Sequence, residues 1–294
     1  MKTRSVLKVP AVKPLALGVG LGLRRAHFGA LLQNLPDAIE WFEVAPENYM
    51  EIGGALYRDF CRLREQRTVI AHSISLSLGS LDPLNKIFLK QLKKFIREHR
   101  IPLASDHICF SSYHQVQFDD LLPLPFTEEA VKHIAKRIRY VQDFLDVPFA
   151  VENISYYAPP GAAEMSEPEF VRAVVEEADA WLLLDVNNIY VNSVNHQFDP
   201  YDYLRQIPLE RIAYVHVAGH RIKRPTFILD THGAAVVTPV WQLLEQLAEM
   251  TSLSSVMIER DNNIPPIKEM LRELQNVHAL VGAKKQETKR RVAG

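Results

Sequence analysis

The sequence predicts a single (β/α)₈ barrel, an α/β fold in which eight parallel strands are each followed by a helix. Three observations lead to this prediction. The chain has 294 residues, close to the ~250 typical of such barrels. Short, apolar, β-rich runs alternate with segments of helical periodicity. No linker divides the chain, and the alternation favours parallel pairing because each crossover returns the chain to the same end of the sheet.

Eight apolar runs are the predicted strands. In chain order they are Leu17–Leu23, Trp41–Val44, Thr68–Ser73, Leu103–Ile108, Pro148–Asn153, Trp181–Val186, Ile212–Val217 and Ser255–Glu259. An open, doubly wound sheet is the alternative fold, but its dinucleotide fingerprint is incomplete after Gly18, Gly20 and Gly22. We therefore interpret these glycines as positions of close backbone approach in the first strand.

Segments between the strands have apolar residues on one helical face and are predicted to be helices. They are Pro83–His99, Thr127–Phe144, Ser166–Glu177, Pro239–Met250 and Ile267–Leu280. Ser166 and Glu169 fit a capping box at the start of one of them. We expect residues 1–16 to be a leader, residues 17–282 the barrel, and residues 283–294, which are charged and lack periodicity, a disordered tail.

The composition indicates a soluble protein of a reducing compartment. The net charge of −1 argues against a protein that wraps a polyanion such as nucleic acid. Cys61 and Cys109 are too few for a disulfide framework and form no CxxC pair, so we expect a cytoplasmic protein. The apolar run at Leu15–Leu23 contains three glycines and precedes Arg24, which favours a first strand over a signal peptide. We expect no membrane association, because no run approaches ~20 apolar residues.

Side chains of the metal-ligand type stand where the predicted strands end. They are His72, Asp106 with His107, Glu152 with Asn153, Asp185 with Asn187 and Asn188, His216, Glu259, and the pair Asp230 and His232 after the seventh strand. Taken singly, such a residue is more often hydrogen-bonded structure, or marks where a strand meets solvent. In a barrel, however, these ends converge on one mouth, where the active site of the fold is built. The recurrence over six strands therefore favours a shared metal site.

Divalent cations would offset the repulsion within such a cluster, because imidazole nitrogen and carboxylate oxygen are their natural ligands. Cysteine is absent from these positions, which argues against a closed structural zinc site. There are more ligands than one ion needs, so a bridging carboxylate and two or three ions are expected. His220 follows His216 by four residues; contact with substrate and no role at all are equally compatible with its position.

With these residues assembled, the chain resembles the multinuclear non-heme iron-dependent oxidase family, whose members are xylose isomerase-like barrels. The resemblance runs from Gly18 to about Val281. The phrases that carry it are Gly20-Leu-Gly-Leu-Arg24, Trp41-Phe-Glu-Val-Ala-Pro-Glu-Asn-Tyr49, His72-Ser-Ile-Ser-Leu-Ser-Leu-Gly79, Ser105-Asp-His107, Asp120-Leu-Leu-Pro-Leu-Pro125, Val151-Glu-Asn153, Leu184-Asp-Val-Asn-Asn188, His216-Val-Ala-Gly-His220, Asp230-Thr-His232 and Ile258-Glu259. A broader likeness extends to the three-metal barrel endonucleases that cut DNA at abasic sites.

The resemblance implies a role for each of these residues. One ion would be held by His72, His107 and Glu152, and a second by the bridging Glu152 with Asp185, His216 and Glu259. A third would be held by Asn188, Asp230 and His232. The nuclease pattern has a histidine where this chain has Asn188, and since an amide is the weaker ligand, the third site is expected to be labile or empty. Glu152, Asp185 and His220 are the expected catalytic residues, and the residues expected to orient the ligands are Asp106, Asn153, Asn187 and Asp261.

The resemblance also implies an activity. Such an enzyme would use two or three iron ions, as a mixed-valent Fe(II)/Fe(III) centre, and dioxygen to modify cysteine residues of a ribosomally made precursor peptide. A small partner protein would present the leader of that peptide. The alternatives are a metal-dependent hydrolase of abasic nucleic acid, a sugar isomerase and a metal-storing barrel. The near-neutral charge disfavours the hydrolase. The absence of a lysine at the predicted strand ends disfavours the isomerase.

Overall fold

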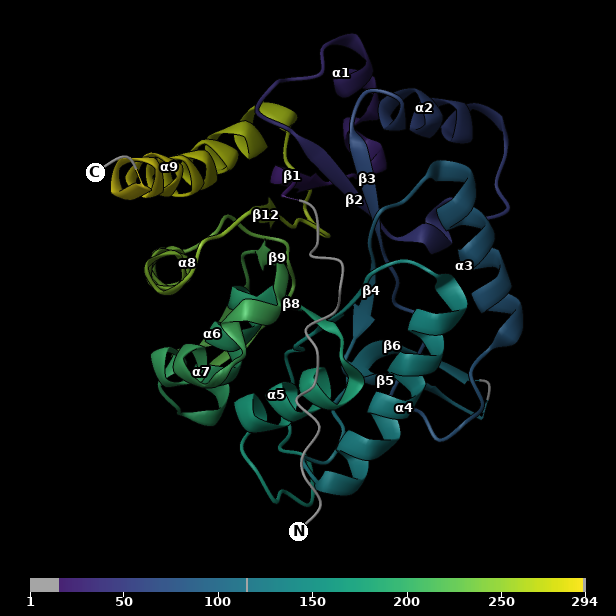
Figure 1. Cartoon of the computed structure of the whole chain (residues 1–294). Helices are drawn as coiled ribbons and strands as arrows, with labels where there is room; N and C mark the ends of the chain where they lie inside the picture. Colours follow the sequence, from purple (N-terminus) through teal and green to yellow (C-terminus); the bar gives the residue numbers. More distant parts are fainter. Residues whose placement is uncertain (1–15, 115, 293–294) are drawn as a thin grey trace.

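The computed structural model describes residues 16–114 and 116–292, and for residue 119 and residues 282–292 it describes the backbone alone. Eight parallel strands close into a barrel with helices around it, in the order β1-β12-β9-β8-β7-β4-β3-β2 (Figure 1). The barrel strands are β1 (Gly18–Gly22), β2 (Trp41–Val44), β3 (Thr68–His72), β4 (Ala104–His107), β7 (Phe149–Glu152), β8 (Trp181–Asp185), β9 (Ile212–Val217) and β12 (Ser255–Ile258). The predicted fold class and all eight predicted strands are confirmed.

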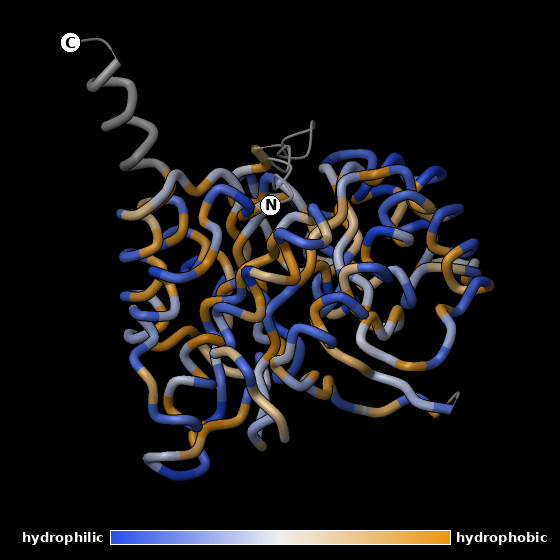
Figure 2. Tube along the Cα trace, turned by 60° about the horizontal axis from the view of Figure 1, so that its bottom comes forward, coloured by the Kyte–Doolittle hydropathy of each residue, from blue (hydrophilic) through white to orange (hydrophobic). Residues whose placement is uncertain are grey.

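Helices form the outer ring. They are α1 (Phe28–Gln33), α2 (Gly54–Arg64), α3 (Lys86–His99), α4 (Glu128–Leu145), α5 (Glu167–Ala178), α6 (Val186–His196), α7 (Pro200–Gln206), α8 (Thr238–Met250) and α9 (Ile267–Val292), with short 3₁₀ helices η1 (Arg25–His27), η2 (Pro46–Asn48) and η3 (Leu209–Arg211). Hydrophobic and hydrophilic residues alternate along them (Figure 2). The capping box at the start of α5 is confirmed, with Ser166 N donating to Glu169 Oε2 over 2.8 Å.

The backbone of α9 extends through Val292 and covers most of residues 283–294, where we expected no regular structure. Lys, Arg, Gln, Glu and Ala dominate this stretch and are good helix formers, and no proline interrupts it. The helix predicted at Ile267–Leu280 can therefore continue. The expected leader, residues 1–16, lies outside the described residues apart from residue 16, and the division into leader, barrel and tail stays a prediction.

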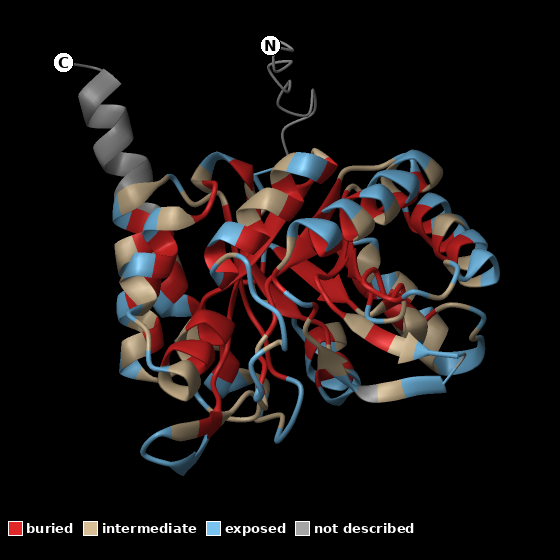
Figure 3. Ribbon diagram, turned by 90° about the horizontal axis from the view of Figure 1, so that it is seen from below, coloured by how far each residue is buried: buried red, intermediate tan, exposed pale blue. Residues whose placement is uncertain are grey.

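Side chains in the barrel strands alternate between the interior of the barrel and the layer beneath the helices, as strand geometry requires. Along β8, Leu182 and Leu184 pack in the large core outside the barrel, while Trp181 and Leu183 pack in the smaller core within it. Buried residues fill the strands and the inner sides of the helices (Figure 3). Asp185 is the next inward position after Leu183, so the apolar interior gives way to polar side chains at the carboxyl ends of the strands.

Glycine in β1 makes room for this interior. A Cβ at Gly20 would lie 2.2 Å from the ring of Trp41, which is fully buried inside the barrel. The predicted close approach in the first strand is thus confirmed at Gly20, because no side chain fits there.

Two antiparallel hairpins that the sequence did not predict lie after β4 and β9. The first pairs β5 (Phe110–Tyr113) with β6 (Val116–Leu122), and the second pairs β10 (Arg221–Arg224) with β11 (Phe227–Leu229). Their strands are short, and only the first contributes to the cavity described below, through residues such as Ser111, Gln117 and Phe118. No helix in the described part of the chain is long and apolar enough to cross a membrane.

Candidate metal centre

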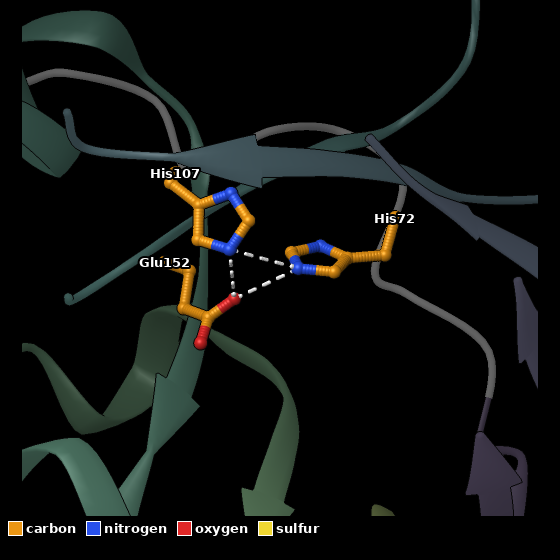
Figure 4. Close-up of side chains that lie close together, drawn as sticks. All are labelled: His72, His107 and Glu152. Carbon is orange, nitrogen blue, oxygen red and sulfur yellow. Dashed lines mark hydrogen bonds and ion pairs between the residues drawn. The ribbon is translucent and has the colours of Figure 1, made fainter. Parts of the chain in front are cut away.

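Three side chains from neighbouring strands point at one another at the carboxyl end of the barrel (Figure 4). His72 Nε2 lies 3.1 Å from His107 Nε2 and 3.0 Å from Glu152 Oε2, and His107 Nε2 lies 3.3 Å from the same oxygen. Ligand atoms ~2.1 Å from one ion and at right angles to each other are about 3 Å apart. The triangle formed by these three atoms therefore has the dimensions of one face of a metal coordination sphere.

Glu152 also faces a second group with its other oxygen. Its Oε1 lies 3.8 Å from His216 Nδ1, and that nitrogen lies 3.0 Å from Glu259 Oε2 and 4.0 Å from Asp185 Oδ2. One carboxylate thus offers one oxygen to each of two adjacent ligand groups. This arrangement would suit a ligand that bridges two ions, the role predicted for Glu152.

The third expected group is brought together only in part. His232 Nε2 lies 2.7 Å from Asp230 Oδ1 and 3.9 Å from Asp185 Oδ2, and its Nδ1 lies 3.2 Å from Glu259 Oε2. Asn188, by contrast, donates from Nδ2 to Glu152 Oε1 over 3.3 Å. Asp185 and Glu259 accordingly form the third geometric group with His232, while Asn188 contacts the bridging carboxylate.

Several atoms of this cluster are buried and form no hydrogen bond within the described residues. They are Glu152 Oε2, Asp185 Oδ2, Asn188 Oδ1, His216 Nδ1 and His232 Nε2. Leaving a buried polar atom unsatisfied costs about 1–3 kcal/mol, so their concentration at one place calls for a partner. Cations bound by nitrogen and oxygen ligands supply that partner, and the side chains present therefore fit a multinuclear metal site.

Burial and charge act in opposite directions on the pKa values of the histidines. Burial lowers the pKa of His72, but the carboxylates of Glu43 and Glu152 raise it to about 9. Burial also lowers the pKa of His216, and Glu43 again raises it, to well above its ordinary value. Burial raises the pKa of Asp185 well above its ordinary value. Protons thus supply positive charge to the metal-free cluster, and metal binding must release them.

The four residues expected to orient ligands all contact a residue of the cluster. Asp106 Oδ1 accepts from His107 N over 2.6 Å and lies 3.5 Å from His107 Nδ1. Asn153 Oδ1 accepts from the backbone N–H of Asp185 over 2.9 Å. Asn153 Nδ2 donates to the backbone carbonyl oxygen of Asp185 over 3.0 Å.

The remaining two orienting residues contact Asp230 and His232. Asn187 Nδ2 donates to Asp230 Oδ1 over 2.8 Å. Asp261 Oδ2 lies 3.3 Å from His232 Nδ1, and its other oxygen is paired with Arg24. These contacts support the orienting roles, which stay predictions.

His220 reaches the cluster through Asn187. Its Nδ1 lies 2.8 Å from Asn187 Oδ1, and because an amide oxygen only accepts, that nitrogen carries the proton. Burial lowers the pKa of His220, which favours the neutral ring. This contact places His220 behind Asp230, so its predicted catalytic role is not supported by a contact with a reacting atom and stays a prediction.

The sequence interpretation missed Glu43. Its Oε2 lies 3.0 Å from His216 Nε2 and accepts from the Tyr214 hydroxyl over 2.8 Å. The predicted site residues stand where strands end, whereas Glu43 lies within the second strand, before Val44. Alternation from the inward-facing Trp41 would have found it, because a charged residue two positions along a buried strand also faces inward.

Part of the cluster lines a cavity of about 840 Å³. Polar residues of its wall include Arg24, Asn48 and Gln117, and apolar ones include Ile74 and Phe118. The volume lies toward the upper end of the range for ligand sites. His72, His107, Glu152 and Glu259 line this cavity, while Asp185 and His216 are fully buried and do not.

Comparison with known proteins identifies the family and the fold. A family profile described as "RiPP precursor modification enzyme MbnB/TglH/ChrH" matches residues 18–282. A UPF0276 protein of Shewanella loihica is 50% identical over 260 residues, which cover 88% of this chain and 93% of that protein. The UPF0276 protein Nmul_A2550 of Nitrosospira multiformis is 45% identical over 265 residues, covering 90% and 93%.

Among solved structures, a D-psicose 3-epimerase in the presence of D-fructose has a TM-score of 0.59 at 12% identity, covering 90% of this chain and 99% of that one. A xylose isomerase-like TIM barrel protein from Mycobacterium smegmatis, in complex with magnesium, has a TM-score of 0.54 at 11% identity, covering 82% of each. These likenesses show the xylose isomerase-like fold alone. The family match and the relatives confirm the resemblance seen in the sequence: the chain belongs to the RiPP precursor modification enzymes MbnB/TglH/ChrH, the multinuclear non-heme iron-dependent oxidase family.

Proposed function

We propose that this protein is an iron- and dioxygen-dependent oxidase that modifies cysteine residues of a ribosomally made precursor peptide. The observation that supports it most is the position of Glu152, which offers one oxygen to His72 and His107 and the other to the group around His216. Glu152 would hold two ions beside an open cavity, where they could act on a bound substrate. Iron, when bound, supplies one-electron redox chemistry toward dioxygen and the cysteine thiolate.

The residues of this chain would hold the metal ions and orient the ligand atoms. His72 and His107 direct their Nε2 atoms at Glu152 Oε2, and His216 directs Nδ1 at Glu259 and the bridge. Two or three ions, in mixed Fe(II) and Fe(III) states, form the proposed cofactor. The ligand set contains no thiolate, and the open cavity leaves one face of the cluster accessible to a substrate sulfur.

The proposed partners follow from this chemistry. The substrate is a precursor peptide with at least one cysteine, and a small leader-binding protein presents it. A thiol substrate also fits the reducing cytoplasm, which is the proposed compartment.

Oxygen uptake tests the proposal. The protein is reconstituted with Fe(II) under anaerobic conditions and mixed with air-saturated buffer and a cysteine-containing peptide encoded beside its gene, together with any leader-binding protein encoded there. We expect oxygen consumption and a mass change in the peptide, and neither with the Cys→Ser peptide or with zinc-loaded protein. A fully iron-loaded enzyme that nicks abasic duplex DNA and leaves the peptide unchanged would favour the hydrolase instead.

A further inference from the structure

A chain of buried hydrogen-bonding groups runs beneath the cluster from His72 to His216. His72 Nδ1 lies 2.8 Å from Ser105 Oγ, which lies 2.7 Å from the hydroxyl oxygen of Tyr214. Tyr214 donates to Glu43 Oε2 over 2.8 Å, and the same oxygen lies 3.0 Å from His216 Nε2. All five residues are at most 6% exposed. The chain therefore joins one histidine of each of the two groups that share Glu152.

The direction of each hydrogen bond follows from the chemistry of its acceptor. A carboxylate only accepts, so both Tyr214 and His216 Nε2 donate to Glu43. Since the Tyr214 proton is used there, its oxygen accepts from Ser105, and the Ser105 oxygen accepts from His72 Nδ1. Ser105 Oγ also lies 3.4 Å from the carbonyl oxygen of Ala71, a longer second contact for the same proton. Every donor thus points toward Glu43.

This order fixes the free nitrogen of each ring. In the neutral form of each ring, which metal binding produces, Nδ1 of His72 and Nε2 of His216 keep their protons, and the lone pairs lie on His72 Nε2 and His216 Nδ1. Those are the two atoms that face Glu152 Oε2 and Glu259 Oε2, at 3.0 Å each. The hydrogen-bond chain and the ligand geometry therefore require the same tautomers, although they involve opposite edges of each ring.

We propose that Glu43 is a positioning residue of the metal centre, which holds His216 directly and His72 through Tyr214 and Ser105. This inference rests on the proposed metal-dependent function. A carboxylate that accepts from the distal nitrogen of a ligand imidazole fixes the ring and raises its basicity. Here one carboxylate serves the histidines of both groups.

Glu43 could instead bind an ion itself, since it forms a geometric group with His216 and Glu259. The two carboxylates lie on opposite edges of the imidazole, with Glu43 against Nε2 and Glu259 against Nδ1. In the positioning role, His216 would hold an ion through Nδ1, and Glu43 would contact only the other nitrogen of the ring. Positioning and direct ligation predict different metal stoichiometries, which makes them separable.

Metal binding by three variants tests the proposal. Glu43→Gln weakens the acceptor, and Tyr214→Phe breaks the chain between Glu43 and Ser105 while leaving the contact with His216. Tyr203→Phe is the matched control, because Tyr203 is another buried tyrosine, with its hydroxyl on Glu167 Oε1 at 3.1 Å. Each metal-free protein is first checked for a native near-UV circular dichroism spectrum, then titrated with Zn²⁺ and with anaerobic Fe²⁺ against a competing chelator.

We expect Glu43→Gln to keep the number of bound ions and to lose about 10- to 100-fold in affinity. Tyr214→Phe should weaken binding by a smaller factor, and Tyr203→Phe should bind as the wild type does. Loss of one whole equivalent in Glu43→Gln would make Glu43 a ligand and overturn the positioning role. Wild-type affinity in both Glu43→Gln and Tyr214→Phe would overturn it as well.

The histidine tautomers give a second readout that needs no variant to fold. In zinc-loaded wild-type protein labelled with ¹⁵N-histidine, long-range ¹H–¹⁵N correlations should show His72 protonated at Nδ1 and His216 at Nε2. The opposite tautomer at His216 would contradict the proposal. If the wild type binds no metal, the proposed function itself fails; if it binds metal but oxidises no peptide, the oxidase assignment fails while the positioning role can still hold.

Discussion

Glu152 is the residue on which the proposed centre depends most. It is 2% exposed, and burial alone would raise its pKa, yet His107, His216 and His72 lower it. The carboxylate is therefore held in its charged form between two groups of ligands. Removing that charge removes what the two groups share.

The first prediction concerns this charge. Glu152→Gln should lose most of the bound iron, because a neutral amide is a weak bridge between two cations. Metal content after anaerobic reconstitution is measured by inductively coupled plasma mass spectrometry. Glu167→Gln, the same substitution at another buried glutamate, is the control and should retain its iron. Unchanged iron in Glu152→Gln would refute the bridging role.

Asn188 allows a second test at the residue scale. Its Nδ2 contacts Glu152 Oε1 and the carbonyl oxygen of Asn153, at 3.3 and 3.0 Å, so the amide supports the bridge more than it completes a third site. Asn188→Ala leaves the Glu152 carboxylate in place, so the variant should lose at most one equivalent of iron. Collapse of all iron binding would show that the assignment of this position is wrong.

The sequence could predict the inward-facing ligands because each ends an apolar run. His72, Glu152, Asp185, His216 and Glu259 each lie two residues after an apolar residue of the interior. It could not predict how Asn188 would be used, because β8 leads directly into α6, and Asp185 caps that helix by accepting from Asn188 N over 2.7 Å. The sequence alone does not distinguish an Asp185 that caps a helix from an Asp185 that binds a metal ion.

At the scale of elements, α5, α6 and α7 meet at a buried carboxyl group outside the metal centre. Glu167, at the start of α5, accepts from Asn192 of α6 and from the hydroxyl of Tyr203 of α7, at 3.2 and 3.1 Å. Burial raises the pKa of Glu167 to about 7, against the opposing effect of these donors. The junction of three helices is therefore sensitive to pH.

The third prediction follows from this shift. A carboxyl group whose folded pKa lies above its unfolded value stabilises the fold most below the unfolded pKa, and this contribution is lost as pH rises through the folded pKa. Wild-type protein should therefore lose stability relative to Glu167→Gln as pH rises from 4.5 to about 7, by up to about 3 kcal/mol. Urea unfolding of the two metal-free proteins measures the difference, and a difference independent of pH would contradict the prediction.

Helix α6 and the two hairpins were not predicted, because their sequences carry weak signals for secondary structure. In α6 the sequence VNNIYVNSVNH is rich in asparagine and valine, which are weak helix formers, and the helix depends on its cap and its packing. The hairpins β5–β6 and β10–β11 are short, and β10 is exposed throughout. Strands that do not alternate between core and solvent leave no periodic signal.

At the scale of the whole molecule, closure of the barrel concentrates charge. Ligands from β3, β4, β7, β8 and β9 and from the loops after β11 and β12 converge on one end, although His72 and Glu259 are far apart in sequence. The charge that this closure concentrates must be balanced by protons or by metal ions. Folding and metal binding are therefore coupled.

The fourth prediction tests that coupling. Chelation of the metal should lower the melting temperature at neutral pH, because the ions bind the folded chain and not the unfolded one. Differential scanning calorimetry of the loaded and stripped protein measures the shift, which should be reversed by Fe²⁺ or Zn²⁺ and be small in Glu152→Gln. An identical melting temperature with and without metal would show that no ion is bound in the folded state.

A crystal structure of the iron-loaded protein, with anomalous data collected at the iron edge, tests directly whether Glu152 bridges two ions. We expect two peaks that share Glu152, one beside His72 and His107 and the other beside Asp185, His216 and Glu259. A single peak away from Glu152, or iron bound elsewhere in the barrel, would contradict it.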